Sequence, residues 1–206
     1  MLKAQRRERE HHQRRTEILA QAEKIFAEKG FRNTSVAEIA TASGFAVGTL
    51  YQFFPSKEQL YISMVTEKLE VLYAFIRDSV AKETHVIKKI ETLVASLYRF
   101  VEAHAAFCSI FSRGDYMSLS EGSAELRRQL TEGYAAHIAL TEALMKEGIR
   151  LGHLKNRDPV RMATALRGIA NAFASEWLNL REEASLMGYV PYVMDIFLGG
   201  VRKDGR

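Results

Sequence analysis

The sequence predicts an all-α protein. Apolar residues recur at spacings of three and four along most of the 206 residues, which is the period of one helical face. The sequence contains no alternating apolar and polar runs of the kind typical of strands, and no internal repeat. Residues that favour the starts and ends of helices, such as Ser35 and Gly44, punctuate the periodic segments. These three observations indicate the same fold class.

The first helix is expected from about Arg14 to Lys29. Its apolar stripe consists of Ile18, Leu19, Ala22, Ile25 and Phe26. Gly30 follows at the position where a left-handed C-cap favours glycine, and Phe31 can fold back onto the helix as the hydrophobic partner of that cap.

Two short helices around a tight turn are expected next. Ser35 and Glu38 have the spacing of a capping box, which sets the start of the first short helix. Gly44 then supplies a turn in which a positive φ costs least. Pro55 ends the second short helix, and Ser56 with Gln59 forms a second capping box that opens the following helix.

The second short helix is predicted to have two different faces. Its inward side chains are Phe45, Leu50 and Phe54, and its outward side chains are Ala46, Val47, Thr49, Tyr51 and Gln52. Gly48 is interpreted as a site of close helix packing. A helix, a glycine turn and a second helix with a polar and aromatic outer face are typical of a DNA-reading helix-turn-helix.

Longer helices follow. They are expected at 56–80, 84–105, 123–151, 159–180 and 185–200, with a break at 112–115. Asp158 as N-cap and Pro159 at the first helical position favour a helix start there. Pro191 should kink or re-cap the last segment.

The motif sequence resembles a known family. The run from Gly44 to Leu60, GFAVGTLYQFFPSKEQL, closely resembles the DNA-binding signature of the tetracycline-repressor (TetR) family, and the run from Ile18 to Phe31 resembles that family's first helix. The likeness is continuous over about residues 14–62. Two positions differ, because Ala46 is often Ser or Thr in the family and Gln52 is often His. These differences affect which bases are read and not the fold.

The resemblance implies a division of the chain and a function. We expect a basic N-terminal arm at 1–13, a three-helix helix-turn-helix DNA-binding domain at 14–60 and a helical ligand-binding and dimerisation domain at 61–206. The function implied is a ligand-responsive DNA-binding transcriptional regulator. In its most direct form this is a repressor that binds a pseudo-palindromic operator as a homodimer and is released by a small-molecule effector.

The residues expected to contact DNA are Thr34, Ala46, Val47, Thr49, Tyr51, Gln52 and Lys57. The resemblance assigns phosphate contacts to Tyr51 and Lys57, and the hydroxyls of the two threonines suit the same role. The Gln52 amide can donate to and accept from adenine. Val47 and Ala46 can meet thymine methyl groups. The alternatives are that Tyr51 packs on the core, that Thr34 only caps a helix, and that Gln52 and Lys57 are merely solvated.

The C-terminal region should hold an effector pocket and a dimer interface. The pocket candidates are Tyr98, Phe107, Phe111, Tyr134, His137, Asn171 and Trp177, for each of which core packing is the alternative. Segments 159–180 and 185–200 are apolar on several faces, so we expect them to pair with a second copy in a four-helix bundle. The interface candidates are Leu166, Ile169, Phe173, Tyr189, Val193 and Phe197. The alternative is a helical core within one chain.

Composition narrows the function classes. No apolar run is long enough for a membrane span, and the N-terminus lacks the apolar core of a secretory signal, so we expect a cytoplasmic protein. The resemblance implies a bacterial protein that joins the nucleoid when bound to double-stranded DNA. Cys108 is the one cysteine and is interpreted as a core residue. No phosphate loop or hydrolase motif occurs, so no enzyme, cofactor or catalytic residue is predicted. The rival function is a helical ligand-binding or protein-interaction module that no longer reads a specific DNA sequence.

The net charge of +4 is unevenly placed. Six of the basic residues lie in the first fifteen positions, namely Lys3, Arg6, Arg7, Arg9, Arg14 and Arg15. This arm either follows DNA phosphates or a minor groove, or it is a solvated terminus that contacts nothing. The adjacent His11 and His12 point in different directions on a helix, so a solvated pair is favoured and no metal site is predicted.

Overall fold

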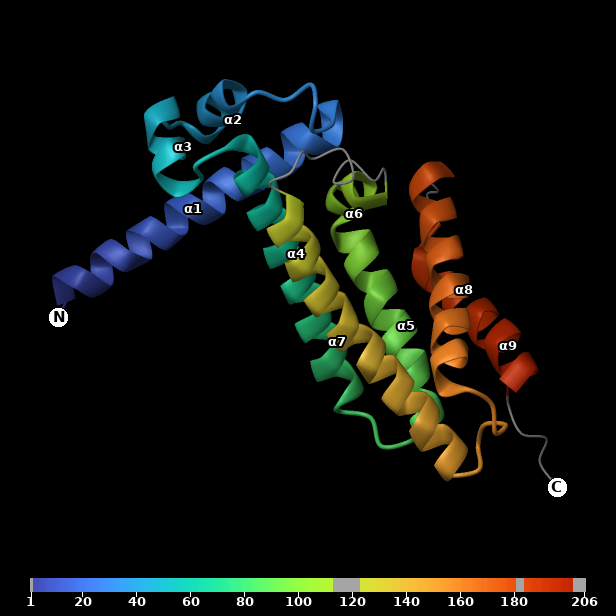
Figure 1. Cartoon of the computed structure of the whole chain (residues 1–206). Coiled ribbons are helices and arrows are strands. Elements are labelled where there is room, and N and C mark those ends of the chain that lie inside the picture. The colour runs from blue at the N-terminus through green and yellow to red at the C-terminus, as the bar shows by residue number, and fades with distance from the viewer. Residues whose placement is uncertain (1, 113–122, 181–183, 202–206) are drawn as a thin grey trace. The chain divides into compact units, whose positions relative to one another are not determined.

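The structure, a computed structural model, describes residues 2–112, 123–180 and 184–201. Its elements are α1 (Leu2–Lys29), α2 (Val36–Ser43), α3 (Val47–Phe53), α4 (Lys57–Val80), α5 (Val86–Ala103), α6 (Ala105–Ser112), α7 (Ser123–Arg150), α8 (Pro159–Leu180), the 3₁₀ helix η2 (Leu186–Tyr189) and α9 (Val190–Val201) (Figure 1). No strand occurs in these three ranges, and the all-α prediction is confirmed.

The chain divides into two compact units. The first comprises Met1–Lys68 and Ala106–Arg128, and the second comprises Leu69–Ala105 and Gln129–Arg206. Helices α4 and α7 contribute residues to both units. In the part of the chain that the structure describes, no helix combines the length and the apolar character that a membrane span requires.

The local signals in the sequence form as predicted. Ser35 and Glu38 make both hydrogen bonds of the capping box, and Gly44 ends α2 in the left-handed region at φ 73°. Gly30 follows α1 at φ 76°. The Asp158 Oδ1 accepts a hydrogen bond from the Val160 amide at 2.9 Å, as expected of an N-cap.

Two predicted boundaries are wrong. Helix α1 begins at Leu2 rather than near Arg14, because polar helix-forming residues continue the helix without an apolar stripe. The predicted helix over 84–105 ends at Ala103, and a separate helix α6 begins at Ala105. Helix α6 has only eight residues, which is too few for apolar periodicity to distinguish it from the end of α5.

The first unit is built around an aromatic cluster. The rings of Phe26 and Tyr61 are 5.3 Å apart edge to face, and Phe31 lies 5.2 Å from Tyr61. Ile39 of α2 and Leu50 of α3 are fully buried. The three N-terminal helices and the start of α4 therefore share one core, on which α3 is fixed in orientation.

The second unit is held by contacts between residues distant in sequence. The Tyr98 hydroxyl of α5 donates to the Ala170 carbonyl of α8 at 3.0 Å. The Glu102 carboxylate accepts from the Ser185 hydroxyl at 2.7 Å, which ties α5 to the segment before α9. These hydrogen bonds set the packing of α5, α8 and η2.

Candidate nucleic-acid interface

Helix α3 separates buried and exposed side chains as the sequence predicts. Leu50 is fully buried and Phe54, directly after the helix, is 2% exposed, so these two side chains anchor α3 to the core. Tyr51 is 49% exposed and Val47 is 40% exposed, which is unusual for large side chains in a helix. Ala46 and Gln52 are exposed beside them, whereas Thr49 is half-buried.

The exposed face of α3 is chemically mixed. The Gln52 amide can donate and accept at once, the Tyr51 hydroxyl can donate to a phosphate, and Val47 is a short apolar surface of the size that meets a thymine methyl. These three side chains occupy one short helix, whose length suits the width of a major groove. The geometry is that of a base-reading helix.

Gly48 does not serve helix packing, so that interpretation is wrong. It lies on the exposed side of α3, and a Cβ built at this position would meet no atom within 4 Å. The glycine instead leaves a bare patch of backbone between Val47 and Thr49. Such a patch permits close approach by another backbone.

The prediction that Thr34 contacts DNA is contradicted. Thr34 is 3% exposed, and its hydroxyl donates to the Gly30 carbonyl at 2.8 Å. It therefore satisfies a carbonyl at the end of α1 and has no surface to offer. The cap of α2 is Ser35.

Lys57 forms hydrogen bonds within the chain, which adds a structural role to the predicted one. Its Nζ donates to the carbonyls of Phe31 and Thr34, both at 2.9 Å, and lies 4.4 Å from the centre of the Phe31 ring. Two of its three N–H donors are used in this way. Lys57 thus fastens the turn between α1 and α2 to the start of α4, and its third N–H is left for the phosphate contact, which stays a prediction.

The basic N-terminal segment is a helix and not an extended arm. His11, expected to be solvated, has its ring centre 4.5 Å from that of Phe53 at the end of α3. The Arg15 guanidinium lies 5.1 Å from the centre of the Phe54 ring and pairs with Glu67. Aromatic residues at the end of α3 therefore position the first half of α1. Spacing within the sequence alone offered no signal for this long-range contact.

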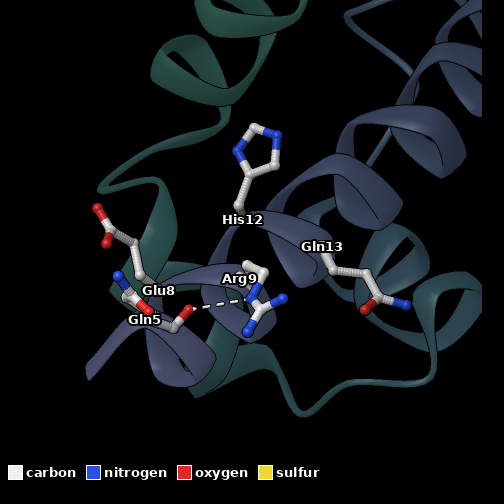
Figure 2. Close-up of a pocket in the computed structure, with 5 residues that line it drawn as sticks. All are labelled: Gln5, Glu8, Arg9, His12 and Gln13. Carbon is white, nitrogen blue, oxygen red and sulfur yellow. Dashed lines mark hydrogen bonds between the residues drawn. The ribbon is translucent and has the colours of Figure 1, made fainter. Parts of the chain in front are cut away.

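A shallow open pocket lies on another face of the same helix (Figure 2). It is lined by Gln5, Glu8, Arg9, His12 and Gln13, all exposed residues of α1. The Arg9 Nε donates to the Gln5 carbonyl at 3.3 Å, which turns that guanidinium toward its own helix. In the described part of the chain, no group of three or more potential metal ligands occurs.

The comparisons with known proteins start from this helix-turn-helix. A model of the family described as bacterial regulatory proteins, tetR family, matches residues 18–64. The HTH-type transcriptional repressor KstR2 of Rhodococcus jostii (strain RHA1) is 32% identical over 136 residues, covering 66% of this chain and 67% of that repressor. The chain belongs to the tetracycline-repressor (TetR) family. This TetR-family chain is a DNA-binding transcriptional regulator and not an enzyme, as predicted.

Solved structures extend the likeness beyond the helix-turn-helix. The fatty acid degradation regulator FadR from Bacillus halodurans is 26% identical with a TM-score of 0.80, covering 91% of this chain and 95% of that one. FadR from Bacillus subtilis, solved with stearoyl-CoA, is 20% identical with a TM-score of 0.79, covering 90% and 98%. The second likeness is one of fold. The helical C-terminal part is thereby confirmed as a TetR-type fold.

The described residues among the effector-pocket candidates differ in burial and belong to both units. Phe107 is buried in the first unit, whereas Tyr98 is buried in the second. Asn171 is exposed on α8, which contradicts its place in an interior pocket. The half-buried Trp177 donates from Nε1 to the Ala184 carbonyl at 2.7 Å and so closes the end of α8. The side chains of Phe111 and Tyr134 lie outside those that the structure describes.

His137 is the pocket candidate with an unsatisfied polar atom. Its ring stacks on Tyr73 at 5.2 Å, and its buried Nδ1 has no hydrogen-bond partner among the described residues. Burial, reinforced by the positive charge of Arg167, lowers the pKa of His137 to about 4. The imidazole is therefore neutral at physiological pH and can donate or accept a hydrogen bond.

Half of the predicted interface residues have no surface left for a partner. Leu166, Val193 and Phe197 are at most 2% exposed within the single chain, so their assignment to a dimer interface is contradicted. Their apolar side chains form the core between α8 and α9. Ile169, Phe173 and Tyr189 are half-buried. Other apolar side chains on these helices are more exposed than these three, namely Val160, Leu180, Tyr192 and Ile196.

Proposed function

We propose that the chain is a repressor that binds a pseudo-palindromic operator as a homodimer and is released by a small-molecule effector. The exposed, chemically mixed face of α3 on a rigid capped frame is the observation that carries this proposal. Gln52 and Val47 would read base edges, Tyr51 and Thr49 would contact phosphates, and Ala46 would lie against a thymine methyl group. The proposed parts are the N-terminal segment 1–13, the DNA-binding domain 14–60 and the sensing and dimerisation domain 61–206.

The proposed dimer uses the outward faces of α8 and α9. On α9, Tyr192 and Ile196 are 63% and 56% exposed and one turn apart. On α8, the exposed Gly168 and Ala172 allow close approach by another helix. An exposed apolar and small-residue surface of this kind suits a second copy of itself, and two-fold symmetry would place the two α3 helices about 34–36 Å apart, in successive major grooves.

The proposed effector class is a long-chain acyl-CoA. One protein of similar fold is a fatty acid degradation regulator, and another, also a FadR, was solved with stearoyl-CoA. In the second unit, the buried Ser96 Oγ and the His137 Nδ1 find no partner among the described residues. Leaving such an atom unsatisfied costs about 1–3 kcal/mol, which a hydrogen bond to a polar group of the effector would offset.

Selection of binding sites from random duplexes tests the function. The full-length protein should enrich a palindrome of two half-sites, and sedimentation at micromolar concentration should give a dimer. Stearoyl-CoA should then release the selected operator, whereas coenzyme A alone should not. Enrichment of no sequence would refute specific reading. Enrichment without release by stearoyl-CoA would refute only the effector class. The proposed setting is the bacterial cytoplasm, with the protein on the nucleoid when bound.

A further inference from the structure

The first half of α1 carries a basic stripe on one face. Arg7, His11 and Arg14 are spaced by four and three residues, so their side chains lie along one side of the helix. Ile18, four residues after Arg14, continues the same stripe and is fully buried in the first unit. The stripe is therefore the extension of the core-facing side of α1 beyond the end of the core.

The C-terminal end of helix α3 contacts this stripe. His11 lies in its middle, and its ring is the one that contacts Phe53 at 4.5 Å. Phe53 is the last residue of α3 and follows the exposed Gln52 directly. Figure 1 shows α1 continuing past α3 toward the N-terminus. Arg7 and Arg14 therefore lie on either side of the contact between α1 and α3.

The two arginines of the stripe carry charges that no described ion pair neutralises. Both are exposed, and neither has an ion-pair partner among the described residues. The neighbouring arginines differ, because the Arg6 Nε pairs with the Glu10 carboxylate at 2.8 Å and Arg15 pairs with Glu67. The side of α1 that adjoins α3 therefore carries positive charge that no described side chain neutralises.

We propose that Arg7 and Arg14 bind phosphates of the DNA backbone next to the bases that α3 reads. This proposal rests on the proposed function, because α3 must lie in the major groove for the stripe to adjoin the duplex. The groove holds one helix, so the stripe meets the backbone at its edge and not the bases. Its helix is already formed, so binding orders little additional backbone.

The contact should appear in the salt dependence of binding. Each phosphate neutralised contributes about 0.9 to the slope of log affinity against log salt concentration. The double variant R7Q/R14Q removes four arginines from a dimer, so we expect it to lower that slope by about 3.6 and to weaken operator binding roughly 100- to 1,000-fold near 0.15 M salt. Gln retains most of the helix propensity of Arg, and both side chains are exposed, so the fold should be unchanged.

A matched control removes the same charge elsewhere. Arg150 and Arg157 are exposed residues of the second unit, and R150Q/R157Q also lowers the net charge by two. This control should leave the slope within about 0.5 of the wild type, on the scale of one phosphate contact. Circular dichroism melting of both double variants checks that they fold.

Trimming the operator locates the contact. Fluorescence anisotropy with duplexes trimmed stepwise toward and into each half-site should show at which phosphate the difference between the wild type and R7Q/R14Q disappears. Equal slopes for the wild type and R7Q/R14Q on the long duplex would overturn the proposal. A wild type that selects no operator would refute the proposed function, and the same slope comparison on a random duplex would still test the stripe.

Discussion

Helix α3 and the pair α8 and α9 both expose large side chains, but the two surfaces differ in chemistry. On α3 the exposed residues mix an amide, a phenol and a short aliphatic group, and the helix ends beside a basic stripe. On α9 the exposed Tyr192 and Ile196 are mainly apolar, and α8 adds small residues. A mixed polar surface beside positive charge fits a polyanion, whereas an apolar surface with small residues fits another helix. Exposure alone therefore does not distinguish the two surfaces, whereas their chemistry fits different partners.

The largest effect is expected from a charge placed in the exposed apolar surface of α9. Ile196→Glu places a carboxylate where the second copy would bury Ile196, so a dimer should become a monomer in sedimentation velocity at micromolar concentration. Operator affinity should fall by roughly 100-fold or more, because the two α3 helices then bind separately. Val71, also 56% exposed but on α4, supplies the matched control Val71→Glu, which should remain dimeric. A dimeric Ile196→Glu variant would place the interface elsewhere.

The next largest effect tests whether Lys57 stabilises the DNA-binding domain or contacts DNA. Lys57→Met removes two charged hydrogen bonds to the carbonyls of Phe31 and Thr34, so the free energy of unfolding should fall by about 2 kcal/mol. Urea titration measures this loss. Lys24→Met, at an exposed position of α1, should change stability by less than about 0.5 kcal/mol. If Lys57→Met retained full stability and lost only DNA affinity, Lys57 would act through a phosphate contact and not as a clamp.

Gln52→Ala tests base recognition by a side chain that does not contribute to the stability of the fold. Because Gln52 is exposed, stability should not change, while operator binding should weaken by about 1–3 kcal/mol and selectivity should relax at one base pair. Binding to the operator and to its single-base variants, measured side by side, gives both quantities. An equal loss on operator and random DNA would contradict base reading by this side chain.

Gly48→Ala should have opposite effects on the stability of the free protein and on its affinity for the operator. A Cβ at this position meets nothing within 4 Å in the protein, and alanine is the better helix former, so stability should rise by roughly 0.5–1 kcal/mol. Operator affinity should nevertheless fall, because the added methyl group holds the DNA backbone away. Thermal melting and anisotropy on the same sample would show the opposite signs. Unchanged affinity would mean that DNA does not approach this patch.

The smallest effect concerns the frame of α2. Hydrogen bonds from Lys29 and from Ser35 lower the pKa of Glu38 from 4.5 to about 2. Since the folded pKa lies below the unfolded value, this carboxylate contributes stability above pH 4.5, and the contribution is lost as the pH falls through about 2. Glu38→Gln should therefore lower stability slightly at pH 7 and flatten its pH dependence between these values. Urea unfolding at several pH values would show whether the two proteins converge in acid.

Prediction from the sequence succeeded where the signal is local. The capping box of Ser35 and Glu38 spans three residues, and the glycine at position 44 needs only its own backbone angle. The two faces of α3 follow from helical period within seven residues, so the exposed Gln52 and Tyr51 were identified correctly. The TetR-type signature is itself a local pattern of this kind, which is why the family was evident from residues 14–62.

Errors arose where a side chain is engaged by residues far along the chain. The carbonyls that hold Lys57 are 26 and 23 residues away, and the hydroxyl of Tyr98 reaches a carbonyl 72 residues away. An apolar residue on α8 or α9 can face its own chain or a second copy, and periodicity does not distinguish the two. Leu166 and Ile196 have similar side chains, yet the first is 1% exposed and the second 56%.

The sequence by itself determined most of the helices, their caps, the family and the exposed face of α3, because each depends on side chains within about one turn of one another. Only the tertiary structure decided that Lys57 is a clamp, that Thr34 is buried, and that the apolar residues of α9 divide into a core side and a free side. Helix propensity and capping act over three or four residues. Burial and hydrogen-bond partners depend on which elements meet, and that is settled by the packing of the whole unit.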